Sequence, residues 1–309
     1  MALRLVATGP AVMSELRSAI GVSGSYELHT WAEHQEAQTR EYPSVVTAPK
    51  SIDNSRHLRM IDSVAGSLAT LHPRSTWLTV GDGHFGADAM RLGRYDIQVH
   101  ASSLTDATLR ESEQKGWIAQ ASAQNAEALT FPDSAFDFVL CKEAYHHFPR
   151  PPIAFYEMLR VARIALVLIE PQRQPASPLG FLRTAFKRAT GRVVEAAYEP
   201  CGNYIFRLSV SELMEMAKAC DLPLVAYRGY NDFYHPRLFR KNVASFGEKV
   251  VFRAGILVQN ILCRLRLMPY GGVSCAVFKK EPAQDVVRSL KATGIRVVRL
   301  PRNPYLTAS

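Results

Sequence analysis

Residues 77–87 read W-L-T-V-G-D-G-H-F-G-A, and this stretch decides the fold. An apolar run, Trp77 to Val80, leads into a turn with glycines at Gly81, Gly83 and Gly86. Apolar residues then return at helical spacing from Ala87 onward. A strand, a glycine-rich turn and a helix N-terminus present backbone N–H groups to a nucleotide-like ligand. Glycine is needed because the turn is tight and a Cβ would hold the ligand away from the backbone.

Strand-like and helix-like segments alternate on both sides of this turn. Further strands are expected at 97–101, 136–141, 165–169, 224–227 and 273–279, and helices at 51–71, 105–115, 152–162, 209–220 and 250–267. Such alternation predicts an α/β fold with a doubly wound, mostly parallel sheet and helices on both faces. We expect an N-terminal extension (1–50), a main domain (51–282) with an insertion at about 172–270 that begins as a basic loop, and a C-terminal appendage (283–309).

The charge of the chain is distributed unevenly. The formal net charge is +9. From Arg237 onward, 14 Lys and Arg stand against 3 Asp and Glu, a net +11, while the other 236 residues carry 23 against 25, a net −2. This basic quarter is either a solvated face or a surface for an anionic partner, such as an acidic glycan, a phosphorylated carrier or a phospholipid membrane contacted peripherally. We see no nucleic-acid-binding module beside it, so no clear nucleic-acid partner is expected.

The cysteines and the N-terminus indicate a cytoplasmic location. Five cysteines, Cys141, Cys201, Cys220, Cys263 and Cys275, are scattered without metal-ligand spacing, so neither a metal site nor a disulfide framework is expected. The first residues lack the long apolar block of a signal peptide. The most apolar helical segment, 252–268, contains three arginines and is a poor membrane span.

A second long motif lies downstream of the glycine turn. Residues 124–148 read Q-N-A-E-A-L-T-F-P-D-S-A-F-D-F-V-L-C-K-E-A-Y-H-H-F. With V-G-D-G-H-F-G at 80–86, this motif resembles the class I S-adenosylmethionine-dependent methyltransferases, in their small-molecule type 11 branch. The resemblance covers about 77–172 and, more loosely, the strands out to 282. It implies a Rossmann-like, seven-stranded sheet and S-adenosyl-L-methionine as the cofactor.

The resemblance also implies which residues contact the cofactor. These are Gly81, Asp82, Gly83, Gly86, Ser102, Ser103, Asn125, Ala126 and Lys142. Three positions where the family usually has carboxylates are neutral here, namely Thr79, Ser103 and Asn125. Asp82 can replace one of these charges beside the cofactor's amino group. Each lost charged hydrogen bond is worth roughly 1.5–3 kcal/mol, so we expect weaker cofactor binding than the family pattern provides.

Three residues after the expected strand at 136–141 are candidate catalytic residues. Methyl transfer from a sulfonium requires positioning of the acceptor and, for a hydroxyl acceptor, removal of its proton. His146 and His147 are candidate bases, with Glu143 as the next choice, and each also has an interpretation as a structural loop residue. The insertion contributes candidates for an acceptor pocket, or else surface loop residues: Tyr204, Arg207, Asn231, Asp232, Tyr234 and His235.

The sequence thus favours a methyltransferase that acts on a hydroxyl of a sugar or polysaccharide intermediate, or of a related small molecule. One alternative is a nicotinamide-dependent oxidoreductase, because Gly81, Gly83 and Gly86 also fit a dinucleotide fingerprint. In that case Ser103 would suit a 2′-phosphate, but the motif at 124–148 would have no role. The other alternative is a non-catalytic partner protein that kept the methyltransferase fold. The oligomeric state is left open.

Overall fold

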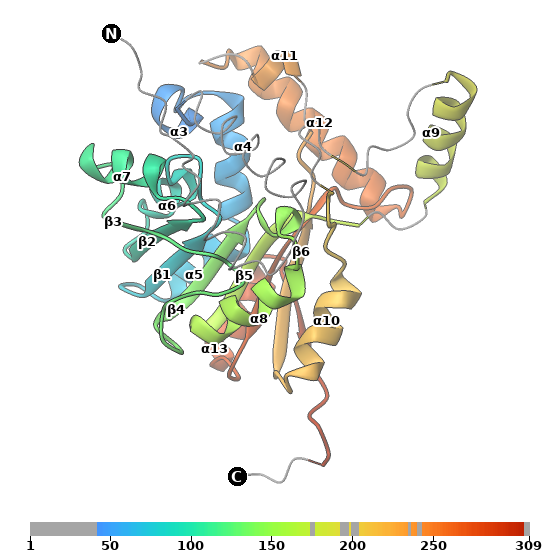
Figure 1. Cartoon of the computed structure of the whole chain (residues 1–309). Coiled ribbons are helices and arrows are strands. Elements are labelled where there is room, and N and C mark those ends of the chain that lie inside the picture. The colour runs from blue at the N-terminus through green and yellow to red at the C-terminus, as the bar shows by residue number, and fades with distance from the viewer. Residues whose placement is uncertain are drawn as a thin grey trace.

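An eight-stranded sheet, in the order β3-β2-β1-β4-β5-β7-β6-β8, forms the centre of the molecule (Figure 1). The computed structural model describes residues 42–173, 177–191, 198, 204–233, 236–239 and 243–305. The strands are β1 (Thr76–Val80), β2 (Gln98–Ser103), β3 (Gln120–Ala123), β4 (Phe136–Lys142), β5 (Ala162–Pro171), β6 (Leu224–Tyr230), β7 (Gly272–Phe278) and β8 (Arg296–Arg299).

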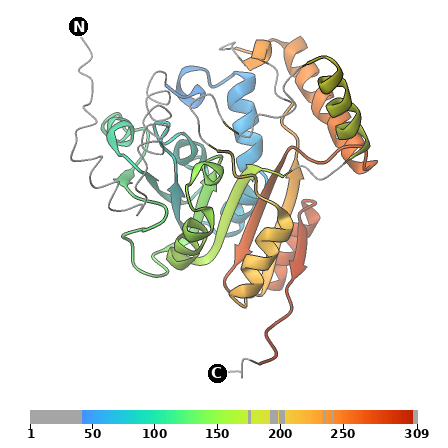
Figure 2. The ribbon, with the colours of Figure 1, turned by 45° about the vertical axis from the view of Figure 1, so that its right-hand side comes forward.

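Helices cover both faces of this sheet (Figure 2). The described helices are α3 (Ser44–Thr47), α4 (Ile52–Ile61), α5 (Val64–Leu71), α6 (Ala87–Leu92), α7 (Ala107–Gln114), α8 (Pro151–Val161), α9 (Pro178–Ala189), α10 (Val210–Ala219), α11 (Pro236–Phe239), α12 (Phe246–Arg264) and α13 (Gln284–Ala292), with a 3-10 turn, η1, at Tyr145–His147. Alternate strand residues enter opposite cores. Leu78 belongs to a core that includes residues of α8 and α10, whereas Trp77 belongs to one that includes residues of α5 and α13.

The strand order determines where a ligand can bind. Strands β1 to β5 pair in parallel, with β2 and β3 on one side of β1 and β4 and β5 on the other. Strand β7 is antiparallel to both β5 and β6, and β8 is antiparallel to β6. Because the chain turns from one side of β1 to the other, β1 and β4 form the switch point of the sheet. In open α/β sheets, ligands bind at the carboxyl ends of the strands at such a point.

Several expectations from the sequence need correction. The sheet has eight strands rather than seven, and strand β8, within the expected C-terminal appendage, pairs with β6. The edge strand β3 was not expected, since its sequence Q-A-S-A lacks the apolar run of a buried strand. The helix expected at 51–71 is two helices, α4 and α5, that meet at Asp62 and Ser63. The expected basic loop after β5 contains α9, a regular helix of 12 residues.

Part of the sequence lies outside the described residues. This holds for 1–41 of the expected N-terminal extension and for Tyr234, His235 and Cys201. The described end of that extension packs on the main domain, where α3 contacts α4 and α6. The expected domain boundaries stay predictions. The four described cysteines are free. Among the described residues, His, Cys, Asp and Glu nowhere gather into a group that could hold a metal ion.

A helix that crosses a bilayer has to be both long and apolar. In the part of the chain that the structure describes, none of the helices combines the length and the apolar character that a membrane crossing requires.

Candidate functional site

A cavity of about 190 Å³ opens at the carboxyl ends of β1 and β4, at the switch point of the sheet. The glycine turn, the start of α6 and the end of β4 form one side, and α4 with the segment before α3 forms the other. Its lining residues are Pro43, Ser44, Asp53, His57, Gly81, Asp82, His84, Ala87, Asp88, Arg91, Lys142 and Glu143. Four predicted site residues, Gly81, Asp82, Lys142 and Glu143, therefore meet in one cavity.

The glycine turn is held tightly on both sides. Gly81 has φ +78°, and a Cβ at this position would come within 2.5 Å of the Cβ of Ala144. The carbonyl of Gly83 accepts a hydrogen bond of 2.7 Å from the Thr108 hydroxyl of α7. Gly86 has φ +68° and directly precedes α6. Gly83 and Gly86 do not line the cavity; they fix the turn that begins α6.

Asp82 lies inside the turn and binds the beginning of α6. One carboxylate oxygen accepts from the backbone N–H of Asp88 at 3.0 Å. The other accepts from the N–H of Ala89 at 2.8 Å and from the Thr79 hydroxyl at 3.0 Å. Burial, with the nearby Asp88, raises the pKa of Asp82 to about 6. Its predicted role beside the cofactor's amino group stays a prediction, and its contacts within the chain are those of a helix cap.

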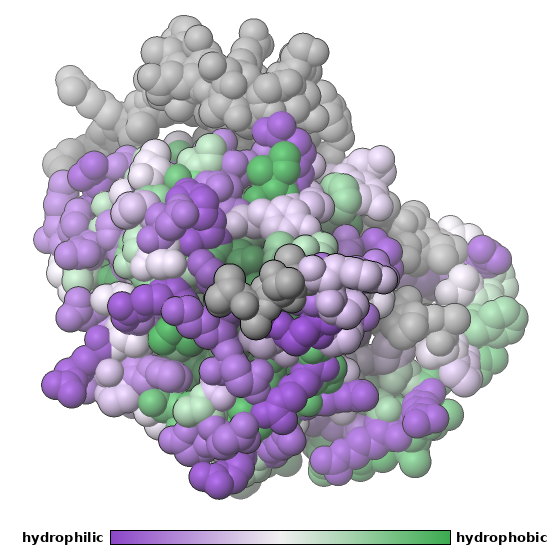
Figure 3. Space-filling view, turned by 90° about the horizontal axis from the view of Figure 1, so that it is seen from below, coloured by the Kyte–Doolittle hydropathy of each residue, from purple (hydrophilic) through white to green (hydrophobic). Residues whose placement is uncertain are grey.

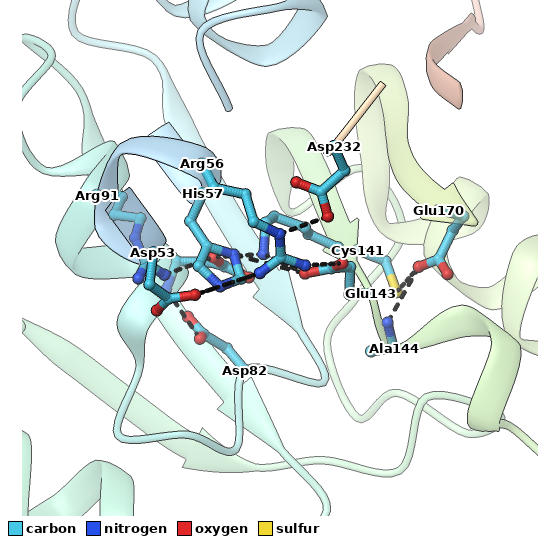
Figure 4. A network of polar contacts seen from close by, with 12 residues as sticks. Asp53, Arg56, His57, Asp82, Arg91, Cys141, Glu143, Ala144, Glu170 and Asp232 are labelled. Carbon is cyan, nitrogen blue, oxygen red and sulfur yellow. Dashed lines mark hydrogen bonds and ion pairs between the residues drawn. The ribbon is translucent and has the colours of Figure 1, made fainter. Parts of the chain in front are cut away.

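Opposite the glycine turn, α4 presents a charged face to the cavity (Figure 4). Asp53, Arg56 and His57 share this face because residues three and four positions apart are neighbours on a helix. The Arg56 guanidinium binds Asp232 at 2.5 Å, Glu143 at 3.1 Å and Asp53 at 3.4 Å. Although burial opposes it, these three carboxylates raise the pKa of Arg56. Arg56 thereby joins α4, the end of β4 and the segment after β6.

Glu143 is the residue on which these contacts converge. It has φ +49°, a left-handed conformation that a non-glycine residue adopts at a cost of about 1–2 kcal/mol. Its carboxylate binds Lys142 at 3.2 Å in addition to Arg56, and His57 Nδ1 lies 3.5 Å away. Burial opposes ionisation, but Lys142 and Arg56 outweigh it and lower the pKa of Glu143. A carboxylate held by two cations is a poor base, which weakens the case for Glu143 in catalysis.

Asp88 of α6 pairs with two cations of the cavity wall, Lys142 and Arg91. Its carboxylate lies 3.3 Å from both the Lys142 ammonium and the Arg91 guanidinium. Burial lowers the pKa of His57 far below its usual value, and the positive charges of Lys142 and Arg91 act in the same direction. The cavity thus combines carboxylates, cations and a neutral imidazole within one wall.

The sequence analysis missed the contribution of α4. The spacing Asp53, Arg56 and His57, on a helix directly before the first core strand, was the available signal. A charged helical face is usually solvated, and only the contacts with Glu143 and Asp232 distinguish this one. Asp232, expected as an acceptor-pocket residue or a surface loop residue, lies against Arg56, and its expected role stays a prediction.

The predicted ribose and adenine contacts lie outside the lining of the cavity. Ser102 and Ser103 are buried at the end of β2, and the Ser102 hydroxyl donates to the Thr79 carbonyl at 2.7 Å. Asn125 Oδ1 accepts from the Glu127 N–H at 2.9 Å, while Asn125 Nδ2 is buried with no hydrogen-bond partner in the structure. Ala126 is buried in the core beside them. These four assignments stay predictions.

His146 is oriented by a buried carboxylate. Its Nδ1 lies 2.6 Å from Glu170 Oε2, and Glu170 Oε1 accepts from the backbone N–H groups of Ala144 and Tyr145 at 3.1 and 3.0 Å. Because a carboxylate only accepts, Nδ1 carries the proton and Nε2 is left as the basic nitrogen. The His147 ring centroid lies 3.9 Å from that of His146. Neither histidine lines the cavity, although both follow Glu143 in the same loop.

The groups in the cavity fit one end of the expected cofactor. Three carboxylates of the wall can accept hydrogen bonds from an ammonium, and two cations can pair with a carboxylate; these are Asp53, Asp88 and Glu143, and Arg91 and Lys142. The wall therefore has groups for both the ammonium and the carboxylate of an amino acid. The unpartnered Asn125 Nδ2 is a donor of the kind that a purine nitrogen accepts. At the ribose position the chain offers hydroxyls in place of a carboxylate.

Comparison with known proteins agrees with this geometry. Residues 78–165 match a family described as "Methyltransferase domain". A 2-methyl-6-phytyl-1,4-hydroquinone methyltransferase of Synechocystis is 30% identical over 107 residues, which is 34% of either chain. The chain thus matches about a third of the length of this curated relative.

Two solved structures resemble the fold. YcgJ from Bacillus subtilis has 16% identity and a TM-score of 0.48, with 74% of this chain and 100% of that chain covered. A methyltransferase from Thermotoga maritima, described as a possible histamine N-methyltransferase, has 16% identity and a TM-score of 0.46, with 82% and 99% covered. The family match runs from β1 through the glycine turn and β4 into β5, so this part of the chain is similar to a methyltransferase domain.

Proposed function

We propose that the chain transfers a methyl group from S-adenosyl-L-methionine to a hydroxyl of a small molecule, in the first place a sugar or polysaccharide intermediate. The observation that carries this proposal is the cavity at the switch point. Its wall joins the glycine turn to Lys142, Arg91, Asp88 and Glu143, the groups that suit the amino-acid end of this cofactor. The cytoplasmic location is part of the same proposal.

The residues of the cavity wall would hold the cofactor by its two charges. Lys142 and Arg91 would pair with its carboxylate, and the acids Asp53 and Asp88 would accept from its ammonium. When bound, S-adenosyl-L-methionine supplies a methyl group on a sulfonium, which is already a good leaving group. The chain therefore has to bring the acceptor into line and remove its proton.

His146 is the residue best suited to take that proton. Glu170 fixes its tautomer, so that Nε2 would accept the proton that the acceptor hydroxyl loses when its oxygen takes the methyl group and the sulfonium's S–C bond breaks. The positive imidazolium that results is stabilised by the Glu170 carboxylate. The backbone carbonyl of His146 also accepts from the Phe206 N–H at 3.0 Å, which connects this loop to the predicted insertion. An acceptor lying between the insertion and the cavity would meet this base.

The acceptor can be sought with a panel of hydroxyl compounds. Radiolabelled S-adenosyl-L-methionine is offered with sugars, sugar nucleotides and hydroquinones, and incorporation of the label is measured. Hydroquinones are included because the Synechocystis relative carries that name. Transfer of the labelled methyl group to compounds of one class would support the proposal. Absence of turnover with every class, together with absence of cofactor binding, would contradict it.

With a substrate identified, His146→Gln tests the base. The variant keeps a polar side chain but has no basic nitrogen, so we expect kcat to fall by about 10²-fold or more. The affinity for S-adenosylhomocysteine should stay unchanged, because His146 does not line the cavity. His100→Gln is the matched control, since His100 is a partly buried histidine of β2 that binds Ser122. Unchanged turnover in His146→Gln would remove the proposed role.

A further inference from the structure

Helix α9 exposes an entire apolar face. Every residue of α9 is described, and none of its side chains is buried. Phe181 and Phe186 are 75% and 60% exposed, and Leu179 and Leu182 lie beside them. Leu179, Leu182 and Phe186 are spaced by three, four or seven positions and share one side of the helix, and Phe181, one position before Leu182, extends this apolar arc to roughly 160°. A soluble helix without a partner does not normally leave such a face uncovered.

The other face of α9 is basic. Arg183, Lys187 and Arg188 lie on it, and the sequence has no Asp or Glu between Glu170 and Glu195. An apolar arc bordered by Arg and Lys, with few acids, is the pattern of a helix that lies in the plane of a membrane interface.

A second exposed apolar face adjoins α9. The N–H of Leu179 donates to the Leu267 carbonyl just after α12 at 3.2 Å, so the start of α9 lies against the end of α12, and the two helices diverge from there (Figure 1). One face of α12 is buried through Phe252, Ile256 and Cys263. Its outer face exposes Phe246, Val250, Val251, Leu257, Val258 and Ile261. Lys249, Arg253 and Arg264 accompany this face, against the single acid Glu248 of the helix.

Hydropathy mapped on the surface agrees with this placement. In Figure 3 apolar residues reach the surface at the right of the view, the side on which Figure 1 places α9, and hydrophilic residues lie next to them. The two helices together form the "α9–α12 surface", which comprises Leu179, Phe181, Leu182 and Phe186 of α9, Phe246, Val250, Val251, Leu257, Val258 and Ile261 of α12, and the basic residues Arg183, Lys187, Arg188, Lys249, Arg253 and Arg264.

We propose that the α9–α12 surface docks the protein on a membrane rich in anionic phospholipid. The apolar side chains would enter the boundary between headgroups and acyl chains, and the basic residues would lie at the level of the phosphates. A second copy of this chain fits less well, because it would bring the same positive charge to the contact. Nucleic acid also fits less well, because aliphatic side chains offer no stacking surface for bases.

The proposed surface is connected to the cavity through the segment that follows β6. Asn231 Nδ2 donates to Asn260 of α12 at 2.9 Å, and the Phe233 ring packs against Gly255 of the same helix. Between them, Asp232 binds Arg56 at the cavity. Docking through α12 would therefore place the carboxyl edge of the sheet, with α4, toward the membrane side (Figure 1). Membrane docking itself does not depend on methyl transfer.

Vesicle co-sedimentation of the full chain tests the proposal. The probes are vesicles of phosphatidylcholine and vesicles of an equal mixture of phosphatidylcholine and phosphatidylglycerol. We expect the chain to sediment with the mixed vesicles, to sediment much less with the neutral ones, and to be released by salt. Phe181→Glu with Phe186→Glu should lower partitioning about tenfold or more, since two exposed rings become charged. Arg183→Glu with Arg188→Glu should lower it by a similar factor.

The controls keep the outcome unambiguous. All substituted side chains are exposed, so circular dichroism and the melting temperature should stay unchanged. Tyr305→Glu, at a residue that is 91% exposed outside the surface, should bind as the unmodified chain does. The proposal would be overturned if the folded chain did not bind the mixed vesicles. It would also be overturned if both double variants bound them as strongly as the unmodified chain. A dimer that the Phe181 and Phe186 substitutions dissociate, without vesicle binding, would assign the surface to a second copy instead. Because the readout is binding, each of these results leaves the proposed methyl transfer unaffected.

Discussion

Arg56 is the charge around which the other buried charges of the site are arranged. It has three carboxylate partners, and its removal would leave Asp232 without its main counter-ion and Glu143 with Lys142 alone. Unpaired buried charges are costly, whereas a complete set of pairs orients its members. The cavity wall is thus ordered before a ligand arrives, which lowers the cost of ordering these side chains on binding.

Asp232 gives the site a measurable dependence on pH. Burial raises its pKa to about 6, although Arg56 opposes the shift. Its carboxyl therefore binds a proton more tightly in the folded chain than in the unfolded chain, where the pKa is about 3.9. Between roughly pH 4 and 6 the folded state binds more protons, so the stabilising contribution of this group decreases as the pH rises.

Asp232→Asn removes this titration. We expect the unfolding free energy of the natural chain minus that of the variant to fall by about 1–3 kcal/mol between pH 4 and 6.5, and to be constant above pH 7. Urea denaturation at each pH measures it, and contributions of other groups, including the low-pKa His57, largely cancel in the difference. A difference that increases over this window would mean that the ion pair with Arg56 outweighs burial.

At the scale of elements, the glycine turn combines two separate constraints. Gly81 has a positive φ, and its missing Cβ leaves room for Ala144 in the loop after β4. The turn therefore needs glycine for its backbone and for its packing. Gly116 shares only the first constraint, because its φ is +69° but nothing lies within 4 Å of a Cβ built there.

Substitution of these two glycines separates the constraints. Gly116→Ala should lower the unfolding free energy by about 1–2 kcal/mol, the cost of a left-handed alanine. Gly81→Ala should lose about 1–3 kcal/mol more, because a new methyl group would overlap Ala144. Urea denaturation of both variants measures this difference. Equal losses would indicate that the loop after β4 moves aside freely and does not hold the turn.

The sequence predicted the elements whose signals are local. The apolar runs of β1, β4 and β5 form where expected. Strand β3 was missed because it is short, polar and at the edge. The site was predicted where residues adjoin the glycine turn or β4. The pairing of Arg56 with Glu143 and Asp232 joins residues 87 and 176 positions apart, which no local pattern encodes.

At the scale of the whole molecule, charge and apolar surface gather on α12, within the quarter that the sequence indicated, and on α9, outside it. The net charge pointed to the quarter after Arg237 as a partner surface. In the structure α9, which precedes that quarter, adjoins α12 within it, and both expose apolar faces beside their basic residues. Cofactor binding at the carboxyl ends of the strands and membrane binding at the α9–α12 surface can therefore be tested separately.

The central claim is that S-adenosyl-L-methionine binds in the cavity at the carboxyl ends of β1 and β4. Isothermal titration of the chain with S-adenosylhomocysteine, and separately with NADPH, tests it most directly. We expect saturable binding of S-adenosylhomocysteine at one site, weakened in Lys142→Met, and no binding of NADPH. Absence of heat with millimolar S-adenosylhomocysteine in a folded sample, or saturable binding of NADPH instead, would contradict the claim.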